Sequence, residues 1–250
     1  IGNNSGKSQG VFTAMLTDFV AEENFFYRNG WHPDVAEAVR NKFNHNLYMA
    51  ENNDPAIVRG NVMVSPGSHS AQMRGGGRFE DNLVVDSPLG AFVRTNPSAM
   101  RRNTVLFSPE TPDRGAADGI GLQAFNLSDV DMSDNVIAFL ANGGDGRGLE
   151  ARDRVGDGTV RGNVVFQWPG EIRTSGSVNV TGNLFNPDAS RLIDPTRNVA
   201  RYQEHLGGRR SQSDFFNWHH NRPMGAWDDD RTGTAASRWI RAGFQPAPFD

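Results

Sequence analysis

A short motif led by asparagine returns seven times along the chain and limits the possible folds more than any other feature. In each return, one or two mostly polar residues precede the asparagine and three or four mostly apolar residues follow it. The spacing is regular in places, because 21 residues separate Asn61 from Asn82 and Asn82 from Asn103. Such a period is the signature of a stacked repeat fold. The motif positions are Asn24, Asn61, Asn82, Asn103, Asn135, Asn163 and Asn183.

A second set of β-rich segments lies between the motifs and reads NLYMAE, SHSAQMR, LGAFVR and IGLQAF. Each repeat therefore carries at least two short strands separated by Gly, Pro or Asn. One repeat cannot bury its own apolar face, whereas stacked repeats form a continuous core. Asparagine suits a fixed corner because it tolerates the left-handed backbone region and can hydrogen-bond along the stack. A sandwich or jelly roll does not explain a fixed corner residue, so the sequence predicts an all-β solenoid.

The motif returns, together with FNHNLYM and SHSAQMRGGGRFEDNLVV, resemble the right-handed parallel β-helix proteins of the pectate-lyase-like superfamily. The resemblance covers roughly residues 11–186. It implies a right-handed parallel β-helix and an activity of the polysaccharide lyase or glycoside hydrolase type. We expect the β-helix to occupy residues 1–195 and to begin in mid-solenoid, with earlier coils missing from this chain.

The tail differs in pattern from the repeats. From about Thr196 the spacing of Val199, Tyr202 and Leu206 is helical, and Gly207 supplies a C-cap. The segments SQSDFFNWHHNRP and TAASRWIRAGF continue this tail. We expect residues 196–250 to form a small α-helical C-terminal cap that packs on the flank or the end of the solenoid. Covering the last coil is favourable because exposed strand edges pair with other chains and promote aggregation.

Composition narrows the classes of function. The chain has 250 residues, a net charge of −4 and no cysteine, which excludes disulfides and thiolate metal sites and argues against nucleic-acid binding. No run of apolar residues is long enough to span a membrane. Lys7 and Lys42 are the only lysines, so 23 of the 25 basic residues are arginine. Arginine suits carboxylates and sulfates, although codon usage in a GC-rich genome explains the bias equally well. No signal peptide is visible, and we expect a secreted or periplasmic bacterial protein whose oligomeric state stays open.

The opening GNNSGKS is close to a phosphate-binding loop but does not fulfil its pattern. That loop needs four residues between its glycines, with a strand before and a helix after. Only three residues separate Gly2 from Gly6, and only Ile1 precedes Gly2. We interpret the stretch as a solenoid corner with Lys7 on its surface.

Two histidines align in neighbouring repeats and mark the candidate site. Aligning NHNLYMA with SHSAQMR places His45 over His69 and Tyr48 over Gln72, with Arg74 at the end of the second segment. Because side chains alternate along a strand, we expect polar side chains of neighbouring strands to line one outer face, which we call the polar wall. The side chains predicted to point into the core are Leu47, Met49, Ala71, Met73 and Val93. The histidines fall in the buried phase, but at strand starts, where a corner can turn them outward. The wall is predicted to contain Asn46, Tyr48, Ser70, Gln72, Arg74 and Arg94.

These residues suit β-elimination of an anionic polysaccharide, with no metal and no cofactor. Elimination needs a cation for the uronate carboxylate, a base for the C5 proton and an acid for the leaving oxygen. Arg74 or Arg94, His45 or His69, and Tyr48 are assigned these roles, with Lys42 as a reserve base. The predicted catalytic residues are His45, Tyr48, His69 and Arg74; the predicted substrate-binding residues are Trp31, His32, Asn46, Gln72, Arg78 and Arg94. For Trp31 the alternative is a loop anchor, and for each histidine a hydrogen-bonded corner residue.

Other readings stay open. Glycoside hydrolysis needs two carboxylates about 5–9.5 Å apart, and no pair stacks as clearly as the histidines do. Calcium-assisted chemistry is possible but lacks a clear ligand cluster, since Asp228–Asp230 reads as a solvated turn or N-cap. A non-catalytic glycan-binding β-helix or a structural fibre segment would use the same fold. The candidate carboxylates are Glu51, Glu80, Asp81, Asp86, Asp118 and Glu150.

Overall fold

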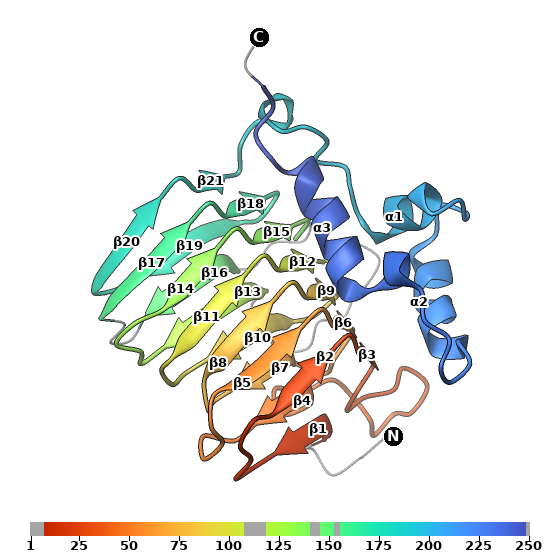
Figure 1. The fold of residues 1–250 in the computed structure, drawn as a ribbon, viewed down its shortest axis with the longest axis horizontal. Coiled ribbons are helices and arrows are strands. Elements are labelled where there is room, and N and C mark those ends of the chain that lie inside the picture. The colour runs from red at the N-terminus through yellow and green to blue at the C-terminus, as the bar shows by residue number, and fades with distance from the viewer. Residues whose placement is uncertain (1–7, 108–118, 141–145, 153–155, 249–250) are drawn as a thin grey trace.

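The computed structural model describes residues 8–107, 119–140, 146–152 and 156–248 (Figure 1). The described residues form 21 strands, and successive strands enter three sheets in turn, so that each coil contributes one strand to each sheet. All strand pairs in the three sheets are parallel. The predicted all-β repeat therefore appears as a β-helix-like solenoid with short helices after it. The opening corner at residues 1–7 lies outside the described residues.

Each sheet has seven strands in the described part of the chain. Sheet A contains β1 (Gln9–Thr13), β4 (His45–Met49), β7 (His69–Met73), β10 (Leu89–Val93), β13 (Ile120–Phe125), β16 (Arg147–Arg152) and β19 (Gly170–Thr174). Sheet B contains β2 (Val20–Glu22), β5 (Ala56–Arg59), β8 (Gly77–Glu80), β11 (Ser98–Arg101), β14 (Asp131–Ser133), β17 (Asp157–Arg161) and β20 (Ser177–Thr181). Sheet C contains β3 (Phe25–Tyr27), β6 (Val62–Val64), β9 (Leu83–Val85), β12 (Thr104–Leu106), β15 (Val136–Ala138), β18 (Val164–Phe166) and β21 (Leu184–Phe185).

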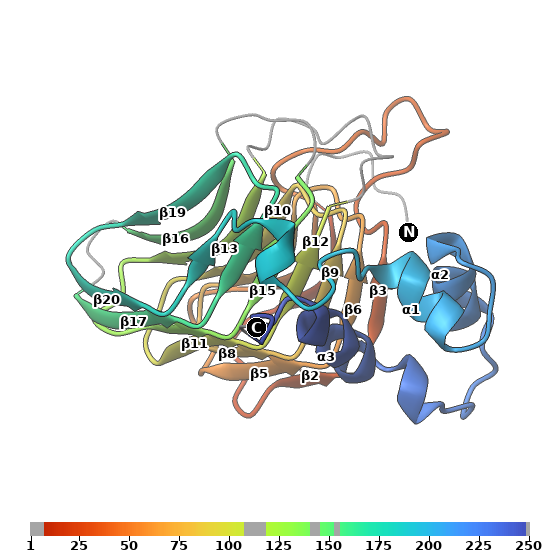
Figure 2. The same cartoon turned by 90° about the horizontal axis from the view of Figure 1, so that it is seen from above.

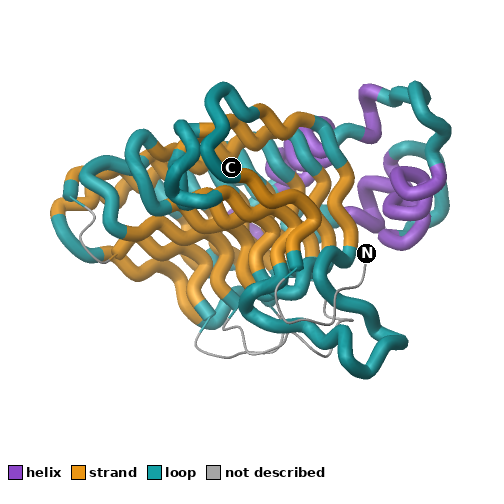
Figure 3. The backbone as a smooth tube through the Cα atoms, turned by 90° about the horizontal axis from the view of Figure 1, so that it is seen from below, coloured by secondary structure: helices purple, strands orange, loops and turns teal. Residues whose placement is uncertain are grey.

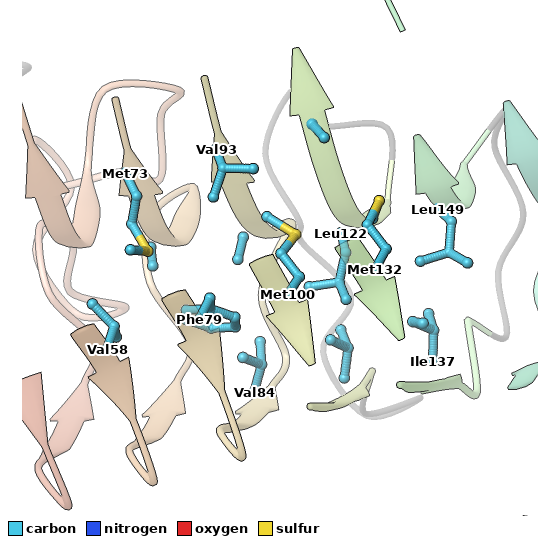
Figure 4. Close-up of a cluster of buried hydrophobic side chains, with 14 of the residues drawn as sticks. Val58, Met73, Phe79, Val84, Val93, Met100, Leu122, Met132, Ile137 and Leu149 are labelled. Carbon is cyan, nitrogen blue, oxygen red and sulfur yellow. The ribbon is translucent and has the colours of Figure 1, made fainter. Parts of the chain in front are cut away.

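The interior of the coils is a continuous apolar core. Side chains from all three sheets meet there, in layers that repeat from coil to coil (Figure 4). Leu47, Met49, Ala71, Met73 and Val93 are each 0% exposed, so these five predicted core residues of sheet A are confirmed. Each coil thereby buries its apolar side chains against the next coil, as the repeat predicts.

The seven motif asparagines stand at the corner between sheets B and C and form one hydrogen-bonded ladder. The Nδ2 of Asn61 donates to Oδ1 of Asn82 at 3.0 Å, and the Nδ2 of Asn82 donates to Oδ1 of Asn103 at 3.1 Å. The same oxygens also accept the backbone N–H of the preceding asparagine. The predicted hydrogen bonding along the stack is confirmed. The remaining rungs join Asn24 to Asn61, Asn103 to Asn135, Asn135 to Asn163 and Asn163 to Asn183.

The backbone part of that prediction is wrong, because the left-handed residue is the one before each asparagine. Gly60 has φ +64°, and Asp81 and Arg102 have φ 55° and 54°. The corner therefore turns at this preceding residue, which leaves the asparagine in a conformation from which its amide reaches the next coil. Glycine fits the turn at little steric cost, and several coils place a charged residue there.

Three α-helices follow the last described strand: α1 (Val199–His205), α2 (Gln212–Asn221) and α3 (Gly233–Gly243). Short 3-10 turns occur at Ala189–Arg191 and Asp229–Arg231. The predicted C-cap is confirmed, since Gly207 follows α1 with φ +80°. Asp228 accepts a hydrogen bond from the backbone N–H of Asp230, which confirms its predicted role as an N-cap.

The helices lie on the flank of the solenoid, beside sheet C (Figures 2 and 3). α3 packs on the outward side chains of this sheet, where Ile240 and Phe244 are both 0% exposed. α2 reaches the first coil, because Phe25 stacks on His219 with ring centres 5.0 Å apart. Of the two expected positions, the described helices therefore take the flank. No helix in the described residues is long and apolar enough to cross a membrane.

Candidate functional site

The strands of sheet A bend near their start, and the bend decides which side chains face outward. The register pairs Gln9 with His45 and Val11 with Leu47, but it skips the residues between them. The same gap recurs two strand pairs further on, between β7 and β10, where Ser70 lies next to Gly90. A Cβ added at the equivalent Gly121 would lie 2.8 Å from the core side chain of Ile137. The residue at this position of each strand therefore faces the core. His45 and His69 each lie one residue earlier, so their side chains lie on the outer face of the sheet.

A row of rings follows the outer face of sheet A. Phe12 stacks on Tyr48 with ring centres 5.6 Å apart, and Tyr48 stacks on His45 at 5.5 Å. The His45 ring lies 5.2 Å from the His69 ring. Beyond His69 the row continues to Phe92 at 5.9 Å. Phe92 then contacts Phe125 at 5.5 Å, so the row crosses five coils. We call these residues the ring row: Phe12, Tyr48, His45, His69, Phe92 and Phe125.

Arginines lie over the rings at two places. The guanidinium carbon of Arg74 is 5.4 Å from the centre of the Tyr48 ring. The guanidinium carbon of Arg152 is 4.5 Å from the centre of the Phe125 ring. The structure thus brings together all four predicted catalytic residues, and it places a further arginine at the far end of the ring row.

Burial controls the protonation of the two histidines. His45 is 3% exposed, and this desolvation, with the nearby charge of Arg74, lowers its pKa to about 4. The pKa of His69 is lowered well below 6.5 by burial first, then by His45 and Arg74. Both imidazoles are therefore neutral at neutral pH.

The hydrogen bonds distinguish the two rings. The backbone N–H of His69 donates to Nδ1 of His45 at 3.4 Å, which places the proton of the neutral His45 ring on Nε2. Nδ1 of His69 lies 3.3 Å from the Ser68 hydroxyl oxygen, which accepts a hydrogen bond when Nδ1 carries the ring proton. In that tautomer the Nε2 of His69 carries a free lone pair.

The predicted polar wall is wrong in part, because the bend turns two of its residues into the core. Asn46 and Ser70 are both 0% exposed, because they lie at the inward-facing position of their strands and not on the outer face. Gln72 lies on the outer face beside Tyr48 but is only 9% exposed. Arg94 is partly exposed and lies 3.9 Å from the carboxylate of Glu51.

Trp31 fits the alternative of a loop anchor. Its Nε1 donates to the carbonyl of Ser65 at 2.6 Å, and Arg40 lies over its ring at 4.1 Å. Arg40 in turn forms a buried ion pair with Asp86 at 2.9 Å. These contacts fasten the segment between β3 and β4 to the neighbouring coils. His32 is exposed in the same segment, and its Nδ1 accepts from the backbone of Asp34 at 3.2 Å.

Arg78 is not part of the same surface. It lies on β8, in sheet B, and its side chain is exposed on the outer face of that sheet. Lys42, the reserve base, is also exposed, and its ammonium lies 5.2 Å from the Phe43 ring. Neither contacts the ring row in the described residues.

The candidate carboxylates are engaged in ion pairs with arginines. Glu80 and Asp81 bind Arg101 and Arg102 at the corner between sheets B and C. Glu150 lies on the outer face of sheet A, where it is 3% exposed and accepts from Gln123 at 2.6 Å and from Arg152 at 3.2 Å. Glu51 and Asp86 pair with Arg94 and Arg40. Asp118 lies outside the described residues.

Phe92, Phe125, Gln123 and Arg152 belong to the site but were not predicted, and Glu150 was predicted only as a candidate carboxylate for glycoside hydrolysis. A signal existed for two of them, because Phe92 and Gln123 continue the alternation that places Tyr48 and Gln72 outward. The prediction considered only polar residues for the outer face, so it omitted the two phenylalanines.

Within the ranges that the structure describes, no three His, Asp or Glu side chains are grouped to hold a metal ion. Searches against protein-family models, curated proteins and solved structures returned no match. The proposal that follows therefore rests on the geometry of the site and on the resemblance described in the sequence.

Proposed function

We propose that this chain is a right-handed parallel β-helix of the pectate-lyase-like type that binds an anionic polysaccharide along sheet A and cleaves it by β-elimination. The observation that supports the proposal is the ring row with arginines over Tyr48 and Phe125. Aromatic faces suit the apolar faces of sugar rings, and guanidinium groups suit their carboxylates. A polymeric substrate fits a secreted or periplasmic location.

The groups assigned to binding the sugar unit are Tyr48 and Arg74. Phe12 is 59% exposed and extends the surface beside Tyr48, so a sugar unit packed on these rings lies within reach of Arg74. In the proposed scheme the guanidinium pairs with the uronate carboxylate. This pairing stabilises the negative charge that develops when the C5 proton leaves.

Proton transfer is assigned to His69 and Tyr48. His69 is neutral, and in the tautomer that donates to Ser68 its Nε2 accepts the C5 proton. The electron pair of the C5–H bond forms the C4–C5 double bond, the C4–O bond breaks, and the Tyr48 hydroxyl donates a proton to the leaving oxygen. His45 stacks on Tyr48 and contacts His69, so it positions both groups.

The test is incubation with a panel of uronate polymers, with two readouts: the ultraviolet absorbance of the unsaturated product, and new reducing ends. Both should rise together for wild type.

Tyr48→Phe should lower kcat by about 10²–10⁴-fold, the usual contribution of general acid catalysis. Arg161→Ala, an exposed arginine of sheet B, is the matched surface control for Arg74→Ala and should leave activity unchanged.

Three results would contradict the proposal in different ways. Reducing ends without the absorbance would point to hydrolysis. Binding of the polymer without either product would identify a non-catalytic glycan-binding solenoid. Absence of both binding and cleavage across the panel would remove the carbohydrate assignment altogether.

A further inference from the structure

The outer face of sheet B carries a groove that the proposed reaction does not use. It has a volume of about 400 Å³ and crosses four successive strands, β5, β8, β11 and β14. This volume lies within the range of small-ligand sites, about 300–1,000 Å³. Its lining includes small residues, among them Ala56, Gly77 and Ala99.

The register explains why the groove exists. Arg78 pairs with Ala99 on the next strand, and Ala99 pairs with Asp131 on the strand after it. These three side chains therefore lie in one row on the same face. Strands are about 4.8 Å apart, so the short side chain of Ala99 leaves a hollow between an arginine and an aspartate. Ile57 closes the row on the other side of Arg78.

The two arginines of the groove differ in their partners. Arg101 is occupied, because its Nε donates to Asp131 at 2.9 Å and its guanidinium lies 3.6 Å from Glu80. Arg78 is exposed and has no carboxylate partner in the described part of the chain. Asp129, at the rim, is exposed and likewise has no ion-pair partner among those residues. The groove thus offers one free cation, one free acceptor and the apolar side chain of Ile57.

We propose that this groove is a second binding site, separate from sheet A, for a carboxylate-bearing oligosaccharide. Arg78 binds the carboxylate, Asp129 accepts sugar hydroxyl groups, and Ile57 contacts the apolar face of a ring. A neutral sugar leaves Arg78 unpaired and binds more weakly. The choice of a uronate as ligand rests on the proposed function, whereas the groove and its free arginine do not.

An NMR titration of the ¹⁵N-labelled chain with saturated trigalacturonate tests the site without requiring catalysis. The amide signals of Ile57, Ser98 and Ala99 should shift, in addition to those of sheet A. Arg78→Ala should weaken the binding reported by the sheet B signals about tenfold or more, the loss expected for one charge-assisted hydrogen bond. Maltotriose, which has no carboxylate, should leave the chemical shifts of these amides unchanged.

Arg161→Ala is the matched control, since Arg161 is an exposed arginine on the same face of sheet B and outside the groove. It should bind like wild type. Unshifted sheet B signals, or shifts that persist unchanged in Arg78→Ala, would overturn the proposal. Arg78-dependent shifts in a protein that cleaves no uronate polymer would instead reject the proposed function and leave the groove intact.

Discussion

Asn82 stands near the middle of the asparagine ladder and shows what one residue does in this fold. Its Oδ1 accepts two hydrogen bonds from Asn61, while its Nδ2 donates to Asn103 and to the carbonyl of Val58. The side chain is 0% exposed, so water cannot replace these partners. A buried donor or acceptor left without a partner costs about 1–3 kcal/mol.

Asn82→Ala should therefore lower the free energy of unfolding by about 2–4 kcal/mol, because it removes the acceptor of two buried N–H groups. Urea denaturation followed by circular dichroism measures the change. Asn179→Ala is the matched control, since Asn179 is exposed on β20 and should be nearly neutral. Equal effects of the two substitutions would show that the ladder contributes no special stability.

The protonation of His45 is a second consequence at this scale. The pKa of His45 is lowered to about 4 in the folded chain, from its ordinary value of 6.5. The folded state therefore binds fewer protons than the unfolded state between these values, and the same direction holds for His69 and His219. Stability from these groups is fully present above about pH 6.5 and is lost as the pH falls towards 4.

Urea unfolding should accordingly give a lower free energy at about pH 5 than at about pH 7.5, with a slope of up to about 1.4 kcal/mol per pH unit for each buried histidine. His219→Gln should reduce this slope, because it removes one of the three titrating groups. His32→Gln, at an exposed position, serves as the control. An unchanged slope in His219→Gln would contradict the assignment.

Among the elements, α3 shows how the tail is attached. Its apolar side faces the outward side chains of sheet C, and Ile240 is fully buried between them. Arg241, at the end of the helix, lies 3.5 Å from Asp81 at the corner of the solenoid. The Glu23 carboxylate accepts from the backbone of Gly233 at 3.1 Å, at the start of the helix. Both ends of α3 are thus held by the corner that carries the asparagines.

Ile240→Ala should destabilise the protein by about 2–5 kcal/mol, because it opens a cavity between the helix and the sheet. Met224→Ala, at a fully exposed position, should change stability by less than about 0.5 kcal/mol. Thermal and urea unfolding monitored by tryptophan fluorescence compare the two. A small effect of Ile240→Ala would mean that the helix contributes little to the stability of the solenoid.

The elements also show where sequence reasoning succeeds and fails. Strands that belong to sheets A and C were predicted, because HNLYM alternates and VVF follows an asparagine in a recurring motif. Sheet B was not predicted as a separate sheet, because strands such as Gly77–Glu80 and Asp131–Ser133 are short and polar. Parallel pairing between coils makes them strands, and this pairing is not local.

For the site, alternation along a strand was enough to group Tyr48 with Gln72, and the aligned histidines were enough to group His45 with His69. The bend in sheet A was not predictable, because it depends on packing against Ile137 and Val165 from another sheet. This is why Asn46 is buried. Arg78 was misplaced for a related reason, since the turn at Gly75–Gly76 separates it from sheet A.

On the scale of the whole molecule, the coils form a stack with two distinct long surfaces and one covered flank. Sheet A presents the ring row, and sheet B presents the groove at Arg78. The helices cover sheet C (Figure 2). Because each coil contacts mainly its neighbours, a change within one coil acts through the coils on either side. The flank helices are the exception, since α3 joins β9 and β12 to the first coil through Glu23.

The asparagine ladder also gives the stack an electrical direction. In each rung the donor belongs to the earlier coil and the acceptor oxygen to the later one, from Asn24 to Asn183. The side-chain amide dipoles therefore point the same way along the axis, and amides aligned in this manner polarise one another. In the described residues, the ladder runs from Asn24 to Asn183, whose amide hydrogens donate to the backbone carbonyls of Val160 and Thr181. The ladder therefore contributes a dipole of fixed direction along the solenoid axis, in addition to the field of the charged side chains.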